Sequence, residues 1–315
     1  MEKRALGRSG LRVAPLVFGG NVFGWTADAA TSFRMLDAFV EAGFDAVDTA
    51  EAYSSWVPGH KGGESETIIG DWLARSGKRD QVVIATKVGW HQGDQPGLLS
   101  AANIARGAED SLRRLRTDRI DLYQAHSDDP QTPMEETLGA FARLIEQGKV
   151  RAIGCSNFSA ARLREALDVS ARLGLPRYES VQPPYNLYQR SDFETELAPL
   201  VQAEDIGVIS YYGLASGFLT GKYRSEADLG QSVRGRGVGR YLNERGFRIL
   251  AALDAAAARL GATPAQVALA WVMARPGITA PIASSTSVKQ LHEILGAADL
   301  RLDPDTMADL DRASA

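Results

Sequence analysis

The sequence is poor in cysteine, because its 315 residues include a single one, Cys155, which has no partner for an internal disulfide. It contains no apolar run of membrane-spanning length, and residues 1–6 lack the apolar core of a secretory signal. The formal net charge of −4 offers no basic excess to attract nucleic acid or an anionic membrane. We therefore expect a protein of the reducing cytoplasm that binds neither nucleic acid nor membranes.

Strand-like apolar runs alternate with helix-like segments along the chain. The predicted strands cover residues 15–18, 44–48, 81–87, 120–125, 150–155, 178–182, 207–211 and 279–283. The predicted helices cover residues 28–42, 64–76, 100–115, 132–147, 159–173, 192–204, 243–260, 264–274, 288–297 and 303–312. Residues 6–13, which precede them, are typical of a small hairpin that turns through Ser9 and Gly10.

Eight strand–helix units without a composition break predict an α/β fold, a single (β/α)8 TIM barrel domain over residues 1–315, with an N-terminal β-hairpin and a C-terminal helix. The alternative, a doubly wound sheet, requires a G-x-G-x-x-G turn after its first strand. Residues 18–24 contain glycines but not that spacing, and no acid follows at the distance that a ribose requires.

Three successive predicted strands end on ionisable residues, namely Asp48, Lys87 and His126, and Tyr53 follows the first of them by five positions. Taken singly, a lysine or tyrosine is usually a packing or surface residue, and a histidine is usually a neutral, hydrogen-bonded side chain. The carboxyl ends of all barrel strands open onto one face, where catalytic groups lie. We therefore expect these four side chains to converge at that face.

The chemistry of such a group would be proton transfer. A buried Asp48 needs a cation, and Lys87 is the expected partner. An ammonium at about 4 Å, in a site of effective dielectric ~20, favours a phenolate by roughly 4 kcal/mol. Tyr53 is therefore expected to act as a general acid with a pKa moved from ~10 towards neutrality. His126 would hydrogen-bond and orient a carbonyl oxygen.

Neither a metal centre nor a nucleophile–base pair is expected. The four histidines, at positions 60, 91, 126 and 292, lack the spacing of a zinc site, and no serine–histidine arrangement stands out.

Long motifs around these residues resemble the aldo-keto reductases from end to end of the chain. The matching stretches are residues 47–53, 85–88, 121–126, 148–158 and 181–186. Within them, Asp48, Tyr53, Lys87 and His126 match the catalytic tetrad of that family. The resemblance implies reduction of aldehydes or ketones to alcohols, with hydride from a nicotinamide and the proton from Tyr53.

The resemblance also implies a cofactor site. Ser156, Asn157 and Gln182 would contact the nicotinamide carboxamide, and Tyr211 would stack on its ring. Diphosphate is expected at the loops after strands seven and eight, with Arg234 closing over the dinucleotide. The other implied cofactor residues, besides Asp48, are Gly20, Asn21, Gly213, Leu214, Ser216, Gly217, Lys222, Ala283, Ser284, Thr286 and Gln290.

We expect NADP as the cofactor, with NAD as the alternative. Gln290 matches relatives that bind the 2′-phosphate, but those relatives commonly carry Lys or Arg where Thr286 stands and Asn where Ile294 stands. A missing cation would weaken the preference for NADPH by about 1–3 kcal/mol.

Aromatic residues in loops after the early strands predict a substrate wall. These are Phe23, Trp25, Trp56 and Trp90, with His91 as a further candidate. Such a wall suits a bulky, mostly apolar, small-molecule carbonyl substrate, which the sequence does not identify.

Two other functions are compatible with the pattern. One is a non-catalytic module that binds a nicotinamide cofactor and regulates a partner. The other is a Schiff-base aldolase that uses Lys87, although a pair with Asp48 disfavours the free amine that this chemistry requires. No heptad repeat or interface strip predicts the oligomeric state.

Overall fold

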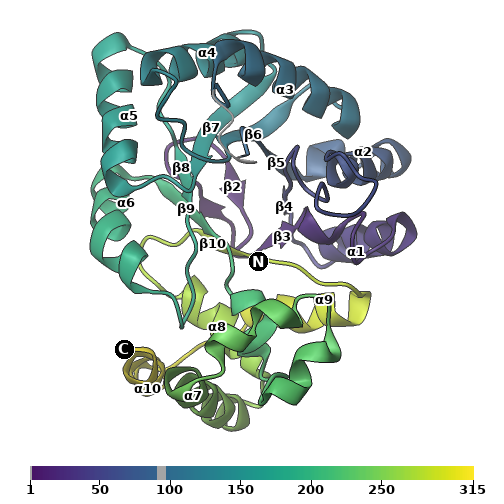
Figure 1. Cartoon of the computed structure of the whole chain (residues 1–315), viewed down its shortest axis with the longest axis vertical. Helices are drawn as coiled ribbons and strands as arrows, with labels where there is room; N and C mark the ends of the chain where they lie inside the picture. Colours follow the sequence, from purple (N-terminus) through teal and green to yellow (C-terminus); the bar gives the residue numbers. More distant parts are fainter. Residues whose placement is uncertain (1, 91–96) are drawn as a thin grey trace.

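The barrel is closed by eight parallel strands, as a computed structural model of the chain shows for residues 2–90 and 97–315 (Figure 1). In spatial order around the barrel the strands run β10-β3-β4-β5-β6-β7-β8-β9. They are β3 (Val17–Gly19), β4 (Ala46–Asp48), β5 (Val83–Val88), β6 (Ile120–Ala125), β7 (Val150–Ser156), β8 (Ser180–Gln182), β9 (Gly207–Ser210) and β10 (Ala280–Ala283). The predicted (β/α)8 barrel is confirmed.

Helices follow the strands in the predicted order. They are α1 (Ala29–Glu41), α2 (Glu64–Ser76), α3 (Ala101–Leu115), α4 (Met134–Glu146), α5 (Ala160–Leu173), α6 (Ala198–Glu204), α7 (Glu244–Leu260), α8 (Pro264–Met273), α9 (Val288–Leu295) and the C-terminal α10 (Pro304–Ser314). Side chains cap several N-termini as local sequence predicts. Asp28, for example, accepts from the Thr31 backbone N–H, and Ser100 from that of Asn103. The predicted helix over 192–204 begins as a π-helical turn, Phe193–Leu197.

The residues between β9 and α7 form short 3-10 turns rather than a long helix. The turns cover Ala215–Thr220, Glu226–Gln231, Gly235–Gly237 and Gly239–Tyr241. Within the residues that the structure describes, no helix is long and apolar enough to cross a membrane.

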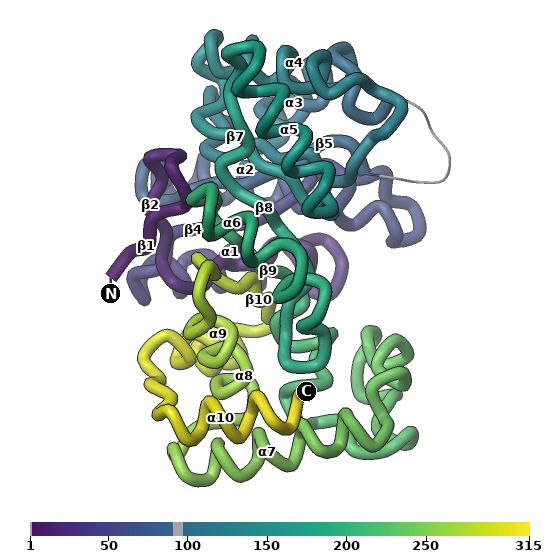
Figure 2. The backbone as a smooth tube through the Cα atoms, turned by 90° about the vertical axis from the view of Figure 1, so that its left-hand side faces the viewer, coloured from purple at the N-terminus to yellow at the C-terminus, as the bar shows by residue number. Residues whose placement is uncertain are grey.

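The hairpin of β1 (Arg4–Ala5) and β2 (Arg12–Val13) covers the amino-terminal end of the barrel. Its Leu6, Leu11 and Val13 are buried in one cluster with inward-facing strand residues. Those residues are Val17, Ala46, Ala85, Leu122, Ala152, Ile209 and Ala280. Figure 2 shows the hairpin and the segment that follows β9 on opposite sides of the molecule. Because the hairpin covers the amino-terminal end, the site can form only at the carboxyl ends of the strands.

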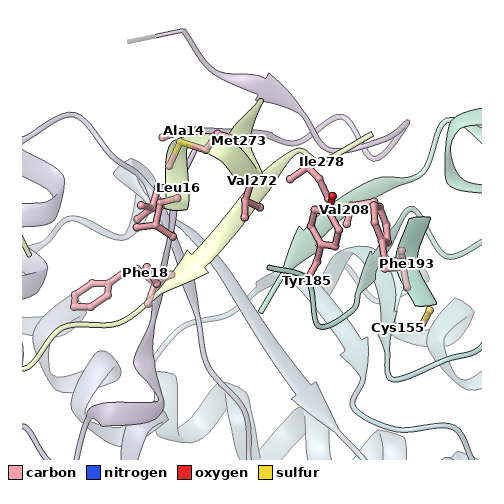
Figure 3. Packing of buried hydrophobic residues seen from close by; sticks show 14 of the residues in the cluster. Ala14, Leu16, Phe18, Cys155, Tyr185, Phe193, Val208, Val272, Met273 and Ile278 are labelled. Atoms are coloured by element: carbon pink, nitrogen blue, oxygen red, sulfur yellow. The ribbon is translucent and has the colours of Figure 1, made fainter. Parts of the chain in front are cut away.

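The alternation of side chains in β3 explains why its sequence is a continuous apolar run. Val17 belongs to the barrel interior, whereas Leu16 and Phe18 belong to the larger cluster between strands and helices. Figure 3 shows Leu16 and Phe18 in that layer, together with Val272 and Met273 of α8.

Candidate active site

A buried ion pair joins the first two strands of the predicted site. Asp48 is the last residue of β4, and its Oδ2 lies 2.7 Å from Nζ of Lys87 on β5. Both side chains are buried. Lys87 Nζ also donates to the Thr49 carbonyl oxygen at 2.8 Å and to the Tyr53 hydroxyl at 2.9 Å. An ammonium has three N–H donors, so all three are used, which disfavours the aldolase alternative.

Tyr53 and His126 complete the group of four. The Tyr53 hydroxyl donates to Asp48 Oδ2 at 3.1 Å while it accepts from Lys87. His126 directly follows β6, and its backbone N–H donates to the Val88 carbonyl at 2.8 Å. The Tyr53 and His126 ring centroids are 5.9 Å apart. The four residues that the sequence spreads over 79 positions therefore meet at one point.

The sequence predicts a lowered pKa for Tyr53, and the structure contradicts the direction of this shift. Burial raises the pKa of Tyr53 well above its ordinary value, and the charge of Asp48 and the hydrogen bond to it raise this pKa further. The Lys87 ammonium favours the phenolate, but burial and the Asp48 carboxylate favour the neutral phenol and outweigh it. In this arrangement the phenol keeps its proton at neutral pH.

Burial also controls the two nitrogen bases. It lowers the pKa of Lys87, an effect that Asp48 partly offsets. Burial, with the Lys87 charge as a second cause, lowers the pKa of His126 well below its ordinary value. His126 is therefore a neutral imidazole at neutral pH, with one ring N–H to donate.

Polar side chains at the ends of β7, β8 and β9 are already hydrogen-bonded to one another and to the ion pair. Gln182 Nε2 donates to Asp48 Oδ1 at 2.9 Å. Asn157 donates from Nδ2 to the His126 carbonyl oxygen at 2.8 Å and accepts from the Tyr211 hydroxyl at 2.8 Å. Ser156 donates from Oγ to the Gln182 carbonyl oxygen at 2.9 Å. The residues predicted to hold the nicotinamide therefore form one connected array beside the tetrad.

The residues predicted along the rest of the cofactor come from two neighbouring parts of the barrel rim. Ser284 follows β10, which ends at Ala283, and donates to Asn21 Oδ1 at 2.6 Å in the loop that starts at Gly20. Thr286 donates from its backbone N–H and its hydroxyl to Gln290 Oε1, at 3.0 and 2.9 Å.

After β9 comes the turn that contains Gly213, Leu214, Ser216 and Gly217. Three successive residues here, Ala215 to Gly217, have positive φ angles of 47°, 58° and 96°. Such backbone costs about 1–3 kcal/mol at each non-glycine position and is concentrated at ligand-binding segments. Lys222, at the end of the turn, is exposed, with Nζ 5.0 Å from the Tyr223 ring centroid.

Arg234 forms no salt bridge with any carboxylate of the described residues. Its guanidinium carbon lies 5.3 Å from the ring centroid of Trp25, and its Nη2 is buried without a hydrogen-bond partner among the described residues. Burial lowers its pKa, and the hydroxyls of Tyr212, Tyr223 and Tyr53 act in the opposite direction. A buried N–H of a cation that makes no hydrogen bond is costly, so an anionic ligand at Nη2 would stabilise this arrangement.

Three of the predicted wall residues surround the tetrad. Trp25 contacts Trp56 at a centroid distance of 5.5 Å, Trp56 contacts Tyr53 at 6.2 Å, and Trp90 contacts His126 at 4.5 Å. Trp56 and Trp90 are 48% and 42% exposed, a large fraction for tryptophan, and so remain available to a substrate.

Phe23 does not belong to this wall. It is completely buried and packs edge-on against Phe18 at 5.3 Å. The 3-10 turn Gly20–Val22 directs this side chain into the core, a change of direction that the loop composition does not reveal. His91 lies outside the described residues.

Two further residues of the site, the buried Gln124 and the half-buried Glu51, were not predicted from the sequence. Gln124 precedes His126 by two positions on β6, and its Oε1 accepts weakly from Gln182 at 3.4 Å. Strand alternation places residues 124 and 126 on the same face, which was the available signal. Glu51, between Asp48 and Tyr53, accepts from the Gly89 backbone N–H at 2.9 Å. Among the described residues, no three His, Cys, Asp or Glu side chains are grouped to hold a metal ion.

Comparison with known proteins places these motifs in a family. A profile of the Aldo/keto reductase family matches residues 15–315. The chain is 37% identical over 316 residues to the uncharacterized oxidoreductase YrpG of Bacillus subtilis (strain 168), covering 98% of this chain and 94% of the relative. It is 32% identical over 336 residues to Protein tas of Escherichia coli (strain K12), covering 99% and 97%. A probable voltage-gated potassium channel subunit beta of Oryza sativa subsp. japonica is 35% identical over 308 residues, covering 95% and 92%.

Proposed function

The chain belongs to the aldo/keto reductase family of oxidoreductases, and from this premise we propose that it reduces aldehydes or ketones to alcohols with NADPH. One observation carries the proposal. The Tyr53 hydroxyl lies 2.9 Å from a buried ammonium and 3.1 Å from a buried carboxylate, beside a neutral imidazole. This arrangement supports delivery of one proton to an oxygen that gains negative charge.

Each side chain would have its own role in the reaction. His126 donates its ring N–H to the carbonyl oxygen and holds it near the Tyr53 hydroxyl. Ser156, Asn157, Gln182 and Tyr211 would hold a nicotinamide ring, which would serve as the hydride donor. Tyr53 gives its proton to the oxygen, and Lys87 stabilises the phenolate that remains. Asp48 holds the ammonium in place through the 2.7 Å contact.

The raised pKa of Tyr53 is compatible with this role. A phenol that is fully protonated at neutral pH is a ready donor, provided that the acceptor is a stronger base than the phenolate. An alkoxide that forms on the substrate is such a base. The proton would therefore move only as hydride transfer creates the charge, and the free site would not lose it to solvent.

The residues of the rim fit an anionic dinucleotide. The supporting observation is the buried Nη2 of Arg234, which has no hydrogen-bond partner in the part of the chain that the structure describes. We propose that Arg234 and Lys222 contact the diphosphate, with backbone from Gly213 to Gly217. Gly20, Asn21, Asp48 and the array of Ser156, Asn157, Gln182 and Tyr211 would hold the nicotinamide end, and Ala283, Ser284, Thr286 and Gln290 the adenosine end. Trp25, Trp56 and Trp90 would contact the substrate.

The test is a Tyr53→Phe substitution assayed with 4-nitrobenzaldehyde. We expect kcat to fall by about 10²–10⁴-fold, the usual contribution of a general acid. The Kd for NADPH, measured by quenching of tryptophan fluorescence, should stay within about twofold. Unchanged turnover in the variant would contradict the role of Tyr53.

Cofactor choice is tested by the same binding measurement with both dinucleotides. We propose tighter binding of NADPH than of NADH, on the basis of Gln290 and of the Arg234 Nη2, which has no hydrogen-bond partner among the described residues. Tighter NADH binding would show that the absence of a positively charged side chain at Thr286 determines the preference.

A second candidate function is a regulatory module that binds the cofactor without turnover. The observation in favour of this alternative is that the rice relative is named as a probable voltage-gated potassium channel subunit beta. Under this alternative, a screen of carbonyl compounds would show cofactor binding but no steady oxidation of NADPH, in wild type and Tyr53→Phe alike. The cytoplasmic location remains a proposal.

A further inference from the structure

Glu51 is a half-buried acid between Asp48 and Tyr53, and the function proposed above gives it no role. It lies in the loop between β4 and α2, three positions after Asp48 and two before Tyr53. Burial raises the pKa of its carboxyl group. Within residues 2–90 and 97–315 no cation forms a salt bridge with this carboxylate, and removing a charge even partly from water without such a partner is costly.

Among the described residues, this carboxylate accepts one hydrogen bond, which links the loop after β4 to the loop after β5. Glu51 Oε1 accepts from the Gly89 backbone N–H at 2.9 Å. The neighbouring cation, Arg114, is in contact with Glu66, whose other oxygen accepts from Thr86. Arg106 and Arg114 act on Glu51 through their charge, in opposition to Glu66.

Gly89 is the point at which the chain leaves β5. Its φ is +82°, a left-handed conformation that glycine adopts readily. A Cβ here would lie 2.8 Å from Leu99 Cδ2, so the turn also needs the small residue. The bond from Glu51 therefore acts on the backbone directly before the next residue, Trp90.

Trp90 covers one side of His126. Their ring centroids are 4.5 Å apart with an interplanar angle of 44°, and Tyr53 meets the same imidazole at 5.9 Å. The charged group that acts on this imidazole is Lys87. Trp90 is thus the half-exposed side of a layer that keeps His126 away from water.

We propose that Glu51 is a positioning residue: as a hydrogen-bond acceptor for Gly89 N–H, it holds Trp90 against the His126 imidazole. The carboxylate acts through the loop and touches neither the substrate nor the reacting atoms. In consequence, Glu51 controls the solvent exposure of His126 and the placement of one wall of the substrate site. The kinetic part of this inference rests on the proposed function, whereas the spectroscopic part does not.

The experiment compares Glu51→Gln, which keeps an acceptor oxygen, with Glu51→Ala, which removes it. The ring of Trp90 is followed by ¹⁹F NMR of protein labelled with 5-fluorotryptophan, with its signal assigned by Trp90→Phe. The titration of His126 is followed by ¹H–¹³C NMR of the four histidines, with its signal assigned by His126→Asn. Trp90→Ala serves as the reference for an uncovered imidazole.

We expect Glu51→Ala to move the Trp90 signal and to shift the titration of His126 upward, in the same direction as Trp90→Ala. We expect Glu51→Gln to match wild type in both. With 4-nitrobenzaldehyde, KM should rise about three- to tenfold in Glu51→Ala, the scale of one lost hydrogen bond, with a smaller change in kcat. If Glu51→Ala does not fold, Glu51→Asp, whose shorter side chain cannot reach Gly89, takes its place.

Three outcomes would overturn the inference. The first is a wild-type Trp90 signal and His126 titration in Glu51→Ala. The second is equal disturbance by Glu51→Gln, which would assign the effect to charge rather than to an acceptor. The third is an unchanged His126 titration in Trp90→Ala. If turnover is absent in wild type, the proposed function fails, and the two NMR readouts still decide the role of Glu51.

Discussion

Tyr53 shows how two opposite charges act on one side chain. Its hydroxyl oxygen accepts from Lys87 and its hydrogen points to Asp48. The ammonium alone would favour the phenolate, but Asp48 is equally close and burial penalises a second negative charge. His126 responds in the opposite sense, because for an imidazole burial disfavours the protonated form. Both shifts favour the protonation states that carbonyl reduction requires.

The pH dependence of reduction follows from these two shifts. Reduction needs protonated Tyr53, which persists below its raised pKa, and neutral His126, which persists above its lowered pKa. We expect kcat/KM for 4-nitrobenzaldehyde to be flat between about pH 7 and pH 9. It should fall only below the ordinary value of histidine, ~6.5, and above that of tyrosine, ~10. A profile with an apparent pKa inside the flat region would show that another group controls the step.

At the scale of elements, the loops that carry Tyr53 and Trp90 depend on two packed helices. Helix α2 follows the first loop and α3 follows the second. Gly70 allows α2 to pass close to the end of α3, because a Cβ there would lie 2.0 Å from the Arg114 carbonyl oxygen. Glu66 of α2 and Arg114 of α3 reinforce this approach with a salt bridge of 2.6 Å.

A matched pair of glycine substitutions tests this packing. Gly70→Ala forces backbone atoms apart and should lower the free energy of unfolding by about 1–3 kcal/mol. Gly139→Ala, in the middle of α4, meets only the mobile end of Arg143 at 3.8 Å. In the Gly139→Ala variant, the free energy of unfolding should stay the same or rise by up to about 1 kcal/mol. Urea unfolding of both variants is the measurement, and equal effects would contradict the close approach at Gly70.

At the scale of the whole molecule, the barrel separates a filled end from a reactive end. Leu6, Leu11 and Val13 of the hairpin are buried with the inward-facing residues of the strands. Small strand residues such as Ala46 and Ala85 leave room in that interior, and the hairpin side chains fill it together with larger strand residues such as Leu122. Polar groups gather instead where the strands end. That the whole of residues 1–315 forms a single domain stays a prediction.

The Leu6→Ala substitution should lower the stability of the fold without lowering the catalytic activity. Loss of this fully buried side chain should lower the free energy of unfolding by about 2–5 kcal/mol. Because the hairpin covers the end away from Tyr53, kcat/KM for 4-nitrobenzaldehyde should stay within about twofold at a temperature where the variant is folded. Urea unfolding and steady-state kinetics measure the two effects, and a kinetic loss without a stability loss would contradict the separation.

Local sequence was enough to predict the order of strands and helices and the meeting of Asp48, Tyr53, Lys87 and His126. Strand and helix periodicity depends on neighbouring residues. A parallel barrel brings the carboxyl ends of all its strands to one face, independently of the loop conformations. Helix boundaries followed for the same reason, since caps such as Asp28 act over three or four residues.

Only the tertiary structure decided the direction of the Tyr53 pKa, the burial of Phe23 and the contact of Arg234 with Trp25. Each depends on desolvation or on a neighbour from a distant part of the chain. The bond from Glu51 to Gly89 is of the same kind, because it joins loops of two different strands. Such contacts have no local signature, since burial is a property of the assembled core and not of any one segment.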